Sequence, residues 1–443
     1  MTTVRTRARR GDLLAGGAVV VLVLAAVAGC LWWNPGRQLG PTAFAGANPR
    51  FGEWPILGTF LPHAGPATVT TAFIALAVVL HGPAFAERLP WRHALAATYG
   101  SAVAWTFSLA LIDGWQTGIA GRLTTSAEYL SEVPGITDIG VMLHTFSDRI
   151  LDFRPGSWTT HVSGHPPGAT LVFVWLDRLG LGGGAAAGVA CILVGALAAV
   201  AVPVTLSALG RRDLARAALP FLALFPGAVW VGVSADGLFT GVTALGIALL
   251  ALGCTGRLAW AAVAGLVLGF GIFLSYGLVL VGAIALAVVL VTRRWAALAV
   301  ALAGALAVVA GFTAAGFWWF DGYHLVVERY YQGIATVRPY GYWVWANLAC
   351  FALATGPVVG PGLLRVVRAP RTGLAAVVAG AVVAVAASDL SGLSKAEVER
   401  IWLPFAVWLV AAGALLPAAS RRWWLAAQAA TALAVNSLVL TNW

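Results

Sequence analysis

The chain has 443 residues, of which 60% are hydrophobic and only 10% are charged, with 52 glycines and 20 tryptophans. Soluble globular domains carry about 25% charged residues, so this composition excludes an ordinary soluble protein and predicts a polytopic membrane protein. The formal net charge of +10 does not indicate nucleic-acid binding, because basic residues in membrane proteins concentrate in cytoplasmic loops.

Long apolar runs dominate the chain. A bilayer core about 30 Å thick needs roughly 20 apolar residues per helix, and helices satisfy their own backbone hydrogen bonds in lipid. The sequence therefore predicts an all-α, polytopic transmembrane helix bundle that forms one domain over residues 1–443. Candidate spans lie at 13–33, 67–83, 94–112, 166–180, 185–207, 212–231, 237–253, 258–274, 276–292, 295–317, 342–360, 373–388, 401–417 and 423–440.

Basic residues in short loops define the expected topology. Arginine pairs and clusters occur at 5–10, 88–92, 293–294, 365–371 and 421–422. The positive-inside rule makes these loops cytoplasmic. They agree with one another only if one segment between 166 and 231 is short, broken or re-entrant, which leaves about 13 spans. Most of the 17 acids then fall in outer loops.

The N-terminal segment allows two interpretations. "RTRARR" followed by an apolar run that ends in "VAGC" is typical of a bacterial lipoprotein signal, with Cys30 as the lipidated residue. The apolar run continues into "LWW", which favours a membrane span instead. Residues 1–93 are therefore expected to hold extra N-terminal spans. Cys191, Cys254 and Cys350 lie singly in apolar runs and are predicted to be core residues.

A long polar loop at 113–165 follows the third span. In "SAEYLSEVPGITDIGVMLHTFSDRILDF" the apolar residues Ile139, Leu143, Phe146 and Ile150 recur at three- and four-residue spacing, which predicts an amphipathic helix. We expect extracytoplasmic juxtamembrane helices here, lying on the membrane with their apolar side down. The alternative is a helix packed on the bundle.

A histidine and two prolines end this loop. "HPPG" at 165–168 precedes an apolar run, and proline suits the first turn of a helix, where backbone donors have no partner. The remaining bundle, 166–443, is thus predicted to begin with a helix that enters from outside. His165 is held at the membrane surface, whereas His161 is less constrained. A zinc site would need a third ligand, so we predict no metal site from this pair.

Four motifs occur in a recognisable order. Asp113 ends the apolar run "TFSLALIDGW", the long loop follows, and "HPPG" leads back into the membrane. Later come "FPGAVWVGVSADGLFTGVTAL", with Pro226 and Asp236, and "KAEVERIWLPF", with Arg400. Over roughly 110–405 this order resembles the GT-C superfamily of membrane glycosyltransferases, which use polyprenyl-phosphate sugars. The chain departs from that superfamily in its extra N-terminal spans and in Gly114, which stands where many members have a second acid.

The resemblance implies the function of a bacterial hexosyl- or pentosyltransferase in the plasma membrane, with its active site on the extracytoplasmic side. The donor would be a polyprenyl-phosphate sugar, and the acceptor a cell-envelope glycan, lipid or protein. Membrane lipid is a further expected partner. No cofactor is expected, and the missing second acid leaves a divalent cation open.

Sugar transfer needs a base that takes the proton from the acceptor hydroxyl. Asp113 is the first choice, because the end of a helix positions a carboxylate more rigidly than a loop, and Glu128 is the second. The alternative for Asp113 is a helix-terminal residue that simply faces water.

The leaving phosphate gains charge and needs cations. Candidates are Arg400, Arg338 and Lys395, and arginine offers a planar fork of donors that matches phosphate oxygens. Arg400 is alternatively an anchor or a partner of Glu397 or Glu399. Substrate contacts are also expected from His165, His161, Asp236 and Tyr340. The tyrosines around Arg338 form either an interfacial aromatic belt or a wall that stacks on sugar.

A membrane transporter or lipid flippase is the alternative function. Transporters place charged residues at mid-membrane and often contain repeated halves. The predicted spans here have almost no charge at their centres, and no internal repeat is evident. A noncatalytic envelope scaffold is a third interpretation.

Overall fold

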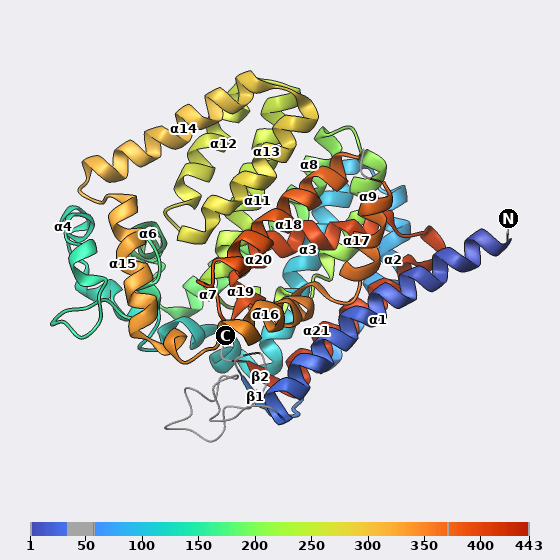
Figure 1. Ribbon diagram of the computed structural model, residues 1–443, viewed down its shortest axis with the longest axis horizontal. Coiled ribbons are helices and arrows are strands. Elements are labelled where there is room, and N and C mark those ends of the chain that lie inside the picture. Colours follow the sequence, from blue (N-terminus) through green and yellow to red (C-terminus); the bar gives the residue numbers. More distant parts are fainter. Residues whose placement is uncertain (1, 33–55, 57, 370–371, 442–443) are drawn as a thin grey trace.

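The computed structural model describes residues 2–32, 56, 58–369 and 372–441, and these are almost entirely helical (Figure 1). This confirms the all-α class. The first expected outer loop lies largely outside the described residues. Buried residues from Ala26 to Val435 form one main hydrophobic cluster, so the described helices share a common core.

Seven described helices are long and apolar enough to cross a membrane. They are α1 (Thr2–Trp32), α2 (Thr68–Arg88), α3 (Trp91–Ala110), α7 with α8 (Gly184–Gly195 and Ala198–Ala208), α11 (Ala235–Thr255), α14 (Trp295–Ala314) and α18 (Gly373–Leu390). An eighth is formed if α16 (Tyr340–Thr355) and α17 (Val359–Arg368), which meet at 98°, make one broken span. A membrane protein is thus supported, whereas a total of about 13 spans is not established.

The elements outside this set complete the described fold. Three apolar helices are too short for the same test, namely α12 (Leu258–Gly271), α13 (Gly282–Thr292) and α20 (Leu403–Val410). The others are α4 (Ile139–His144), α5 (Thr160–Ser163), α6 (Pro167–Arg178), α9 (Arg212–Ala223), α10 (Ala228–Val231), α15 (Trp319–Gln332), α19 (Val398–Ile401) and α21 (Ala418–Leu438), with strands β1 (Gly58–Phe60) and β2 (Val439–Thr441).

The region between 166 and 231 contains two irregular elements. Helix α6 has 12 residues, which at 1.5 Å per residue spans about 18 Å, well short of a bilayer core. The expected span at 212–231 is divided into α9 and the four-residue α10. The short helix and the divided span are two different segments, whereas the basic loops require one irregular segment, so the number of crossings in this region stays a prediction.

The loop at 113–165 differs from the expected amphipathic helix. Only α4, with six residues, is α-helical between Ile139 and Ile150, and the rest folds as short turns. Phe146 and Ile150 are fully buried, with the Phe146 ring 5.3 Å from Trp158 and 5.5 Å from Phe317. The apolar positions thus pack on the protein, because the aromatic core offers them a closer partner than a surface helix would find.

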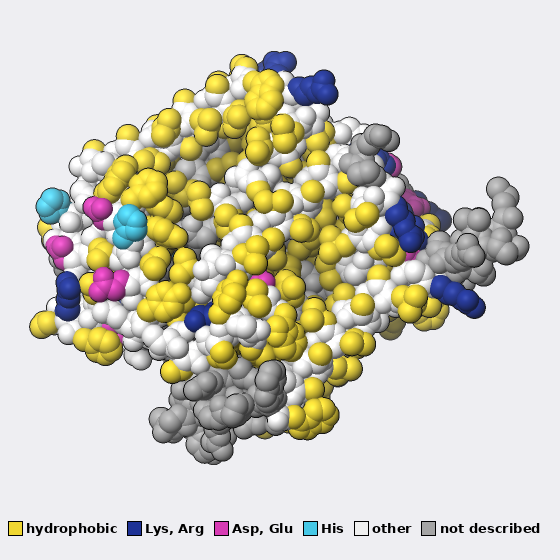
Figure 2. All heavy atoms as spheres, viewed as in Figure 1, with side chains coloured by type: hydrophobic (Ala, Val, Ile, Leu, Met, Phe, Trp, Pro, Cys, Tyr) yellow, Lys and Arg dark blue, Asp and Glu magenta, His cyan; other side chains and the backbone are white. Residues whose placement is uncertain are grey.

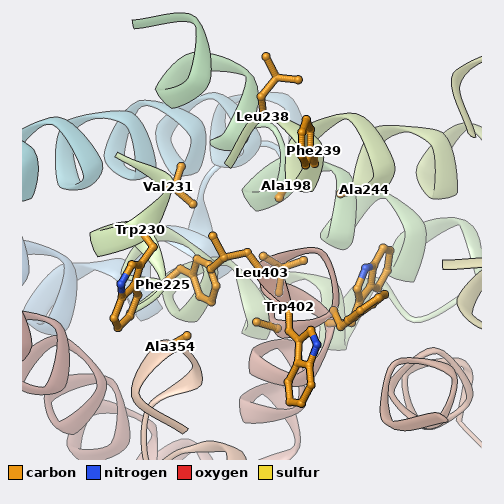
Figure 3. Packing of buried hydrophobic residues seen from close by; sticks show 14 of the residues in the cluster. Ala198, Phe225, Trp230, Val231, Leu238, Phe239, Ala244, Ala354, Trp402 and Leu403 are labelled. Atoms are coloured by element: carbon orange, nitrogen blue, oxygen red, sulfur yellow. The ribbon is translucent and has the colours of Figure 1, made fainter. Parts of the chain in front are cut away.

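Helix α11 lies at the centre of the bundle. Of its apolar window, 78% is buried, compared with 11% for the peripheral α14. Helix α11 packs against α20, and in Figure 3 Phe239 of α11 lies on the same side of the cluster as Leu238, above Leu403, the first residue of α20. A Cβ atom on Gly241 would collide with the Val194 carbonyl group of α7. Glycine thus lets these two backbones approach closely, as in other membrane helix pairs.

Charged residues gather at opposite ends of the molecule. In Figure 2 most of the visible Lys and Arg side chains lie along the top and right edges, whereas His and several acids lie at the left, near α4 and α15. Strand β1 pairs antiparallel with β2, with Gly58 opposite Thr441. This pairing ties the segment before α2 to the end of the chain.

Candidate functional site

Four helices begin around one cluster of buried charged residues. Helix α6 starts at Pro167, α11 at Ala235, α16 at Tyr340 and α20 at Leu403. The short helix α19, which precedes α20, packs against α10, α11 and α16. The first backbone N–H groups of a helix have no intrahelical partner and favour negative charge nearby. The carboxylate of Asp236 accordingly lies in the first turn of α11.

Arg400 on α19 joins three segments of the chain. Its Nη1 donates to Asp236 Oδ2 at 2.6 Å, and its Nη2 donates to Glu397 Oε2 at 2.9 Å. Nη2 also lies 3.3 Å from His161 Nε2. Burial alone would lower the pKa of Arg400, but Asp236 and Glu397 raise it above its usual value. The guanidinium therefore stays charged although only 6% of the residue is exposed.

Glu397 bridges Arg400 to the second predicted arginine. Arg338 Nη1 and Nη2 both lie 3.2 Å from Glu397 Oε1, and Nη1 donates to the Lys395 carbonyl group at 2.7 Å. The Lys395 ammonium instead donates to the Ala335 carbonyl group. The structure thus brings the two predicted arginines together, while the Lys395 charge is directed to a backbone oxygen.

His161 links the arginines to the long loop. Its Nδ1 lies 2.9 Å from the Ala127 carbonyl oxygen and 3.3 Å from Glu128 Oε1. A carbonyl oxygen only accepts, so Nδ1 carries the ring proton and Nε2 accepts from Arg400. Burial, Arg400 and His165 lower the pKa of His161 to about 3. The imidazole is therefore neutral at physiological pH and positions its neighbours without adding charge.

Glu128 is a buried carboxyl group beside this cluster, with 8% of the residue exposed. Burial raises its pKa to about 7, Arg400 offsets part of that increase, and Asp236 adds to it. A carboxyl group whose pKa lies near physiological pH can both take and return a proton. Perturbed acids next to fixed charges are typical of functional sites. Glu128, the second choice from sequence, therefore has the environment of a general base.

His165 occupies the position that the double proline predicted. Pro166 caps α6, and His165 immediately precedes it. His165 Nδ1 lies 2.8 Å from the His161 carbonyl oxygen, and its ring packs 5.8 Å from Tyr129 and 5.6 Å from Phe239. Burial lowers its pKa. The two histidines therefore lie next to each other in the same site.

Asp113, the first choice for the base, contacts different partners. His63 Nε2 lies 2.8 Å from its Oδ1, and Arg122 Nη2 lies 3.2 Å from its Oδ2. Arg122 Nη1 also donates to the Thr441 carbonyl group at 2.9 Å. Among the described residues, Asp113 and Arg122 thus connect the segment that precedes α2 with strand β2. The structure does not bring it into contact with Arg400.

Tyr340 lies at the start of α16 and is 44% exposed. Its hydroxyl group donates to the Leu390 carbonyl group at 3.2 Å, and its ring lies close to Gly392.

Glu397, which precedes α19, and Glu399, which lies in α19, belong to the buried cluster although the sequence did not single them out as site residues. The sequence predicts Glu397 only as a possible partner of Arg400, whereas in the structure it bridges Arg400 and Arg338. Glu399 is fully buried, and within the part of the chain that the structure describes neither of its carboxylate oxygens has a hydrogen-bond partner. Burial raises the pKa of Glu399 to about 8, which favours the protonated form of its carboxyl group at neutral pH.

Within residues 2–32, 56, 58–369 and 372–441, no three or more His, Cys, Asp or Glu side chains are grouped to hold a metal ion. No protein-family model, curated protein or solved structure matches the chain.

Proposed function

We propose that this protein is a multi-pass membrane glycosyltransferase that moves a sugar from a polyprenyl-phosphate donor to an acceptor of the bacterial cell envelope. The proposal rests on the position of the His161 imidazole between Glu128 and Arg400. Glu128 Oε1 lies 3.3 Å from one of its nitrogens, and Arg400 Nη2 lies 3.3 Å from the other. A proton acceptor and an anion-binding arginine are therefore held on opposite sides of one ring.

Each group has a role in glycosyl transfer. The acceptor hydroxyl oxygen attacks the anomeric carbon of the sugar, and its proton passes to the Glu128 carboxylate. The bond between the anomeric carbon and the phosphate oxygen breaks, and both electrons leave with the phosphate. Arg400 and Arg338 stabilise the charge that develops on this phosphate. The products are the new glycoside, polyprenyl phosphate and protonated Glu128.

The base in this proposal is Glu128 rather than Asp113. Burial and neighbouring charge give Glu128 a pKa near 7, whereas Asp113 is paired with Arg122 and His63. Both oxygens of the Asp113 carboxylate are thus engaged by the side chains that it joins. The resemblance to the superfamily motifs in "HPPG" and "KAEVER" supports the same donor class.

The test measures a product common to all candidate sugars. Purified protein in proteoliposomes is incubated with a panel of polyprenyl-phosphate sugars and a cell-envelope fraction, and the release of polyprenyl phosphate is measured. We expect release with at least one donor, dependent on the envelope fraction and on Glu128.

Two outcomes would reject the proposal. One is the absence of release with every donor of the panel. The other is movement of a fluorescent polyprenyl-phosphate lipid between leaflets without any bond cleavage, which would favour a flippase. Asp213→Asn serves as the matched control variant, because Asp213 pairs with Arg211 in an exposed position away from the cluster.

A further inference from the structure

We propose that Glu397 is a placeholder carboxylate. It occupies the anion site between Arg338 and Arg400 and leaves that site when a lipid phosphate binds. The inference rests on the proposed function for the identity of the anion, and on the geometry of three side chains for the site itself.

The first argument is the contact pattern of the Glu397 carboxylate. Oε1 accepts from both terminal nitrogens of Arg338 at 3.2 Å, and Oε2 accepts from Arg400 at 2.9 Å. One planar anion thus spans two guanidinium forks that come from separate segments. Phosphate oxygens match such forks as well as carboxylate oxygens do. A phosphate therefore needs no new cation in order to bind here, only the departure of this carboxylate.

The second argument is the backbone that presents Glu397. Ala396 and Glu397 have φ values of 69° and 64°, the left-handed region that residues with a Cβ atom disfavour. Asn347 holds this conformation, because its Oδ1 accepts from the Ala396 N–H at 3.0 Å and its Nδ2 donates to the Ser394 carbonyl group at 2.6 Å. Backbone held in a disfavoured region is typical of switch segments and ligand clamps.

The third argument is charge. Arg338 and Arg400 form ion pairs with the carboxylates of Asp236 and Glu397, so these two positive and two negative charges cancel. The donor phosphate is a diester with one negative charge, the same as Glu397, so the exchange is neutral in the ground state. Bond cleavage turns the diester into a monoester, whose second pKa is about 6. Both arginines then face additional charge, and the exchange favours the transition state over the ground state.

The Glu397 side chain is the most accessible of the three. It is 15% exposed, whereas the side chains of Arg338 and Arg400 are 4% and 8% exposed. Displacement of Glu397 therefore requires less desolvated material to move than displacement of either arginine.

The competing interpretation is a fixed counter-ion that keeps its place when phosphate binds. Charge alone does not separate the two, because removing a nearby anion raises phosphate affinity in both cases. Glu397→Asp separates them, since it keeps the charge but is too short to bridge both arginines. A placeholder lowers the apparent affinity by the fraction of time it occupies the site. Only the placeholder predicts that this charge-conserving change tightens binding.

The experiment measures binding of farnesyl phosphate to the purified protein in nanodiscs. We expect Glu397→Asp and Glu397→Gln to bind it about tenfold more tightly than the unmodified protein. Glu399→Gln, two residues away, is the matched control and should change little. Binding of farnesol measures the contribution of the isoprenoid chain alone, and binding of inorganic phosphate measures that of the anion alone. Binding by Glu397→Asp that is no tighter than that of the unmodified protein overturns the proposal.

A density map with farnesyl phosphate gives a second test that needs no variant. We expect phosphate oxygens within hydrogen-bonding distance of Arg338 and Arg400, with the Glu397 carboxylate displaced. Phosphate found beside a carboxylate that still bridges both arginines, or at another place, rejects the placeholder. Neither measurement depends on sugar transfer. Tighter binding by Glu397→Asp without any transferase activity would retain the placeholder and reject the proposed function.

Discussion

Arg400 Nη1 lies 2.6 Å from Asp236 Oδ2, although 164 positions separate the two residues in the chain. This pair joins the start of α11 to α19 and fixes the guanidinium group beside His161. A buried pair of this kind is expensive to break, because the remaining charge then lacks a partner in low-dielectric surroundings. The pair therefore holds α11 and α19 together and is also part of the candidate site.

Replacement of Glu128 by glutamine should abolish sugar transfer while leaving donor binding intact. Loss of a general base typically slows a reaction by a factor of about 10² to 10⁴. The amide keeps the size of the side chain, so the fold should survive. Release of polyprenyl phosphate and binding of farnesyl phosphate are measured on the same preparation.

Asp113→Asn is the comparison that decides the base. Because Asp113 is held by Arg122 and His63, we expect this variant to keep near-normal transfer and to lose some thermal stability. The opposite pattern, with transfer lost in Asp113→Asn and kept in Glu128→Gln, would return the role of base to Asp113. Full activity in both variants would contradict the mechanism.

Transfer should rise with pH through about 7, since the Glu128 carboxylate is the active form and its pKa is raised from 4.5 to about 7. The folded protein binds this proton more tightly than the unfolded chain does. The contribution of this proton to the stability of the folded protein is therefore complete below about pH 4.5 and is lost as pH rises through 7. Rates and melting temperatures at about pH 5 to 8 test both effects. A melting temperature of Glu128→Gln that follows the unmodified protein at every pH would contradict the assigned pKa.

Arg400→Lys should weaken binding of farnesyl phosphate by about tenfold or more, because one ammonium group cannot replace a planar fork. Arg400→Ala should in addition destabilise the fold by about 3–5 kcal/mol, since Asp236 is 4% exposed and would lose its partner. Arg211→Ala is the control, and its exposed pair with Asp213 should cost at most about 1 kcal/mol. Unchanged phosphate binding in both Arg400 variants would leave this residue a structural anchor.

Gly241→Leu should destabilise the bundle by about 1–3 kcal/mol or more, because its side chain would meet the Val194 carbonyl group of α7. Gly311→Leu on α14 is the matched control, since a Cβ atom there has open space. Thermal unfolding in detergent measures both. Equal melting temperatures for the two variants would show that the contact between α7 and α11 is not tight in the membrane.

The loop that carries Glu128 should face the cell exterior. Thr137 is exposed in this loop, and Ala296 is exposed beside the basic pair that ends α13. The four native cysteines are buried and can be replaced beforehand. We expect Thr137→Cys to react with an impermeant thiol reagent on intact cells, and Ala296→Cys to react only after permeabilisation. The reverse order of labelling would invert the topology.

The sequence by itself determined the class of protein and several local features. Hydropathy is a property of consecutive residues, so the apolar helices follow from it directly. Proline acts on the turn in which it stands, so "HPPG" predicted that α6 begins at Pro167. The need for a short or broken segment between 166 and 231 came from counting arginines in loops. Each of these depends on neighbours along the chain.

Only the tertiary structure distinguished Glu128 from Asp113, because the two acids share one loop and differ mainly in what packs around them. Burial beside Arg400 and Asp236 gives Glu128 a pKa near 7, whereas Arg122 and His63 hold Asp113. Desolvation and Coulomb energy depend on distances in space. Those distances arise when segments far apart in the sequence meet, which no local pattern records.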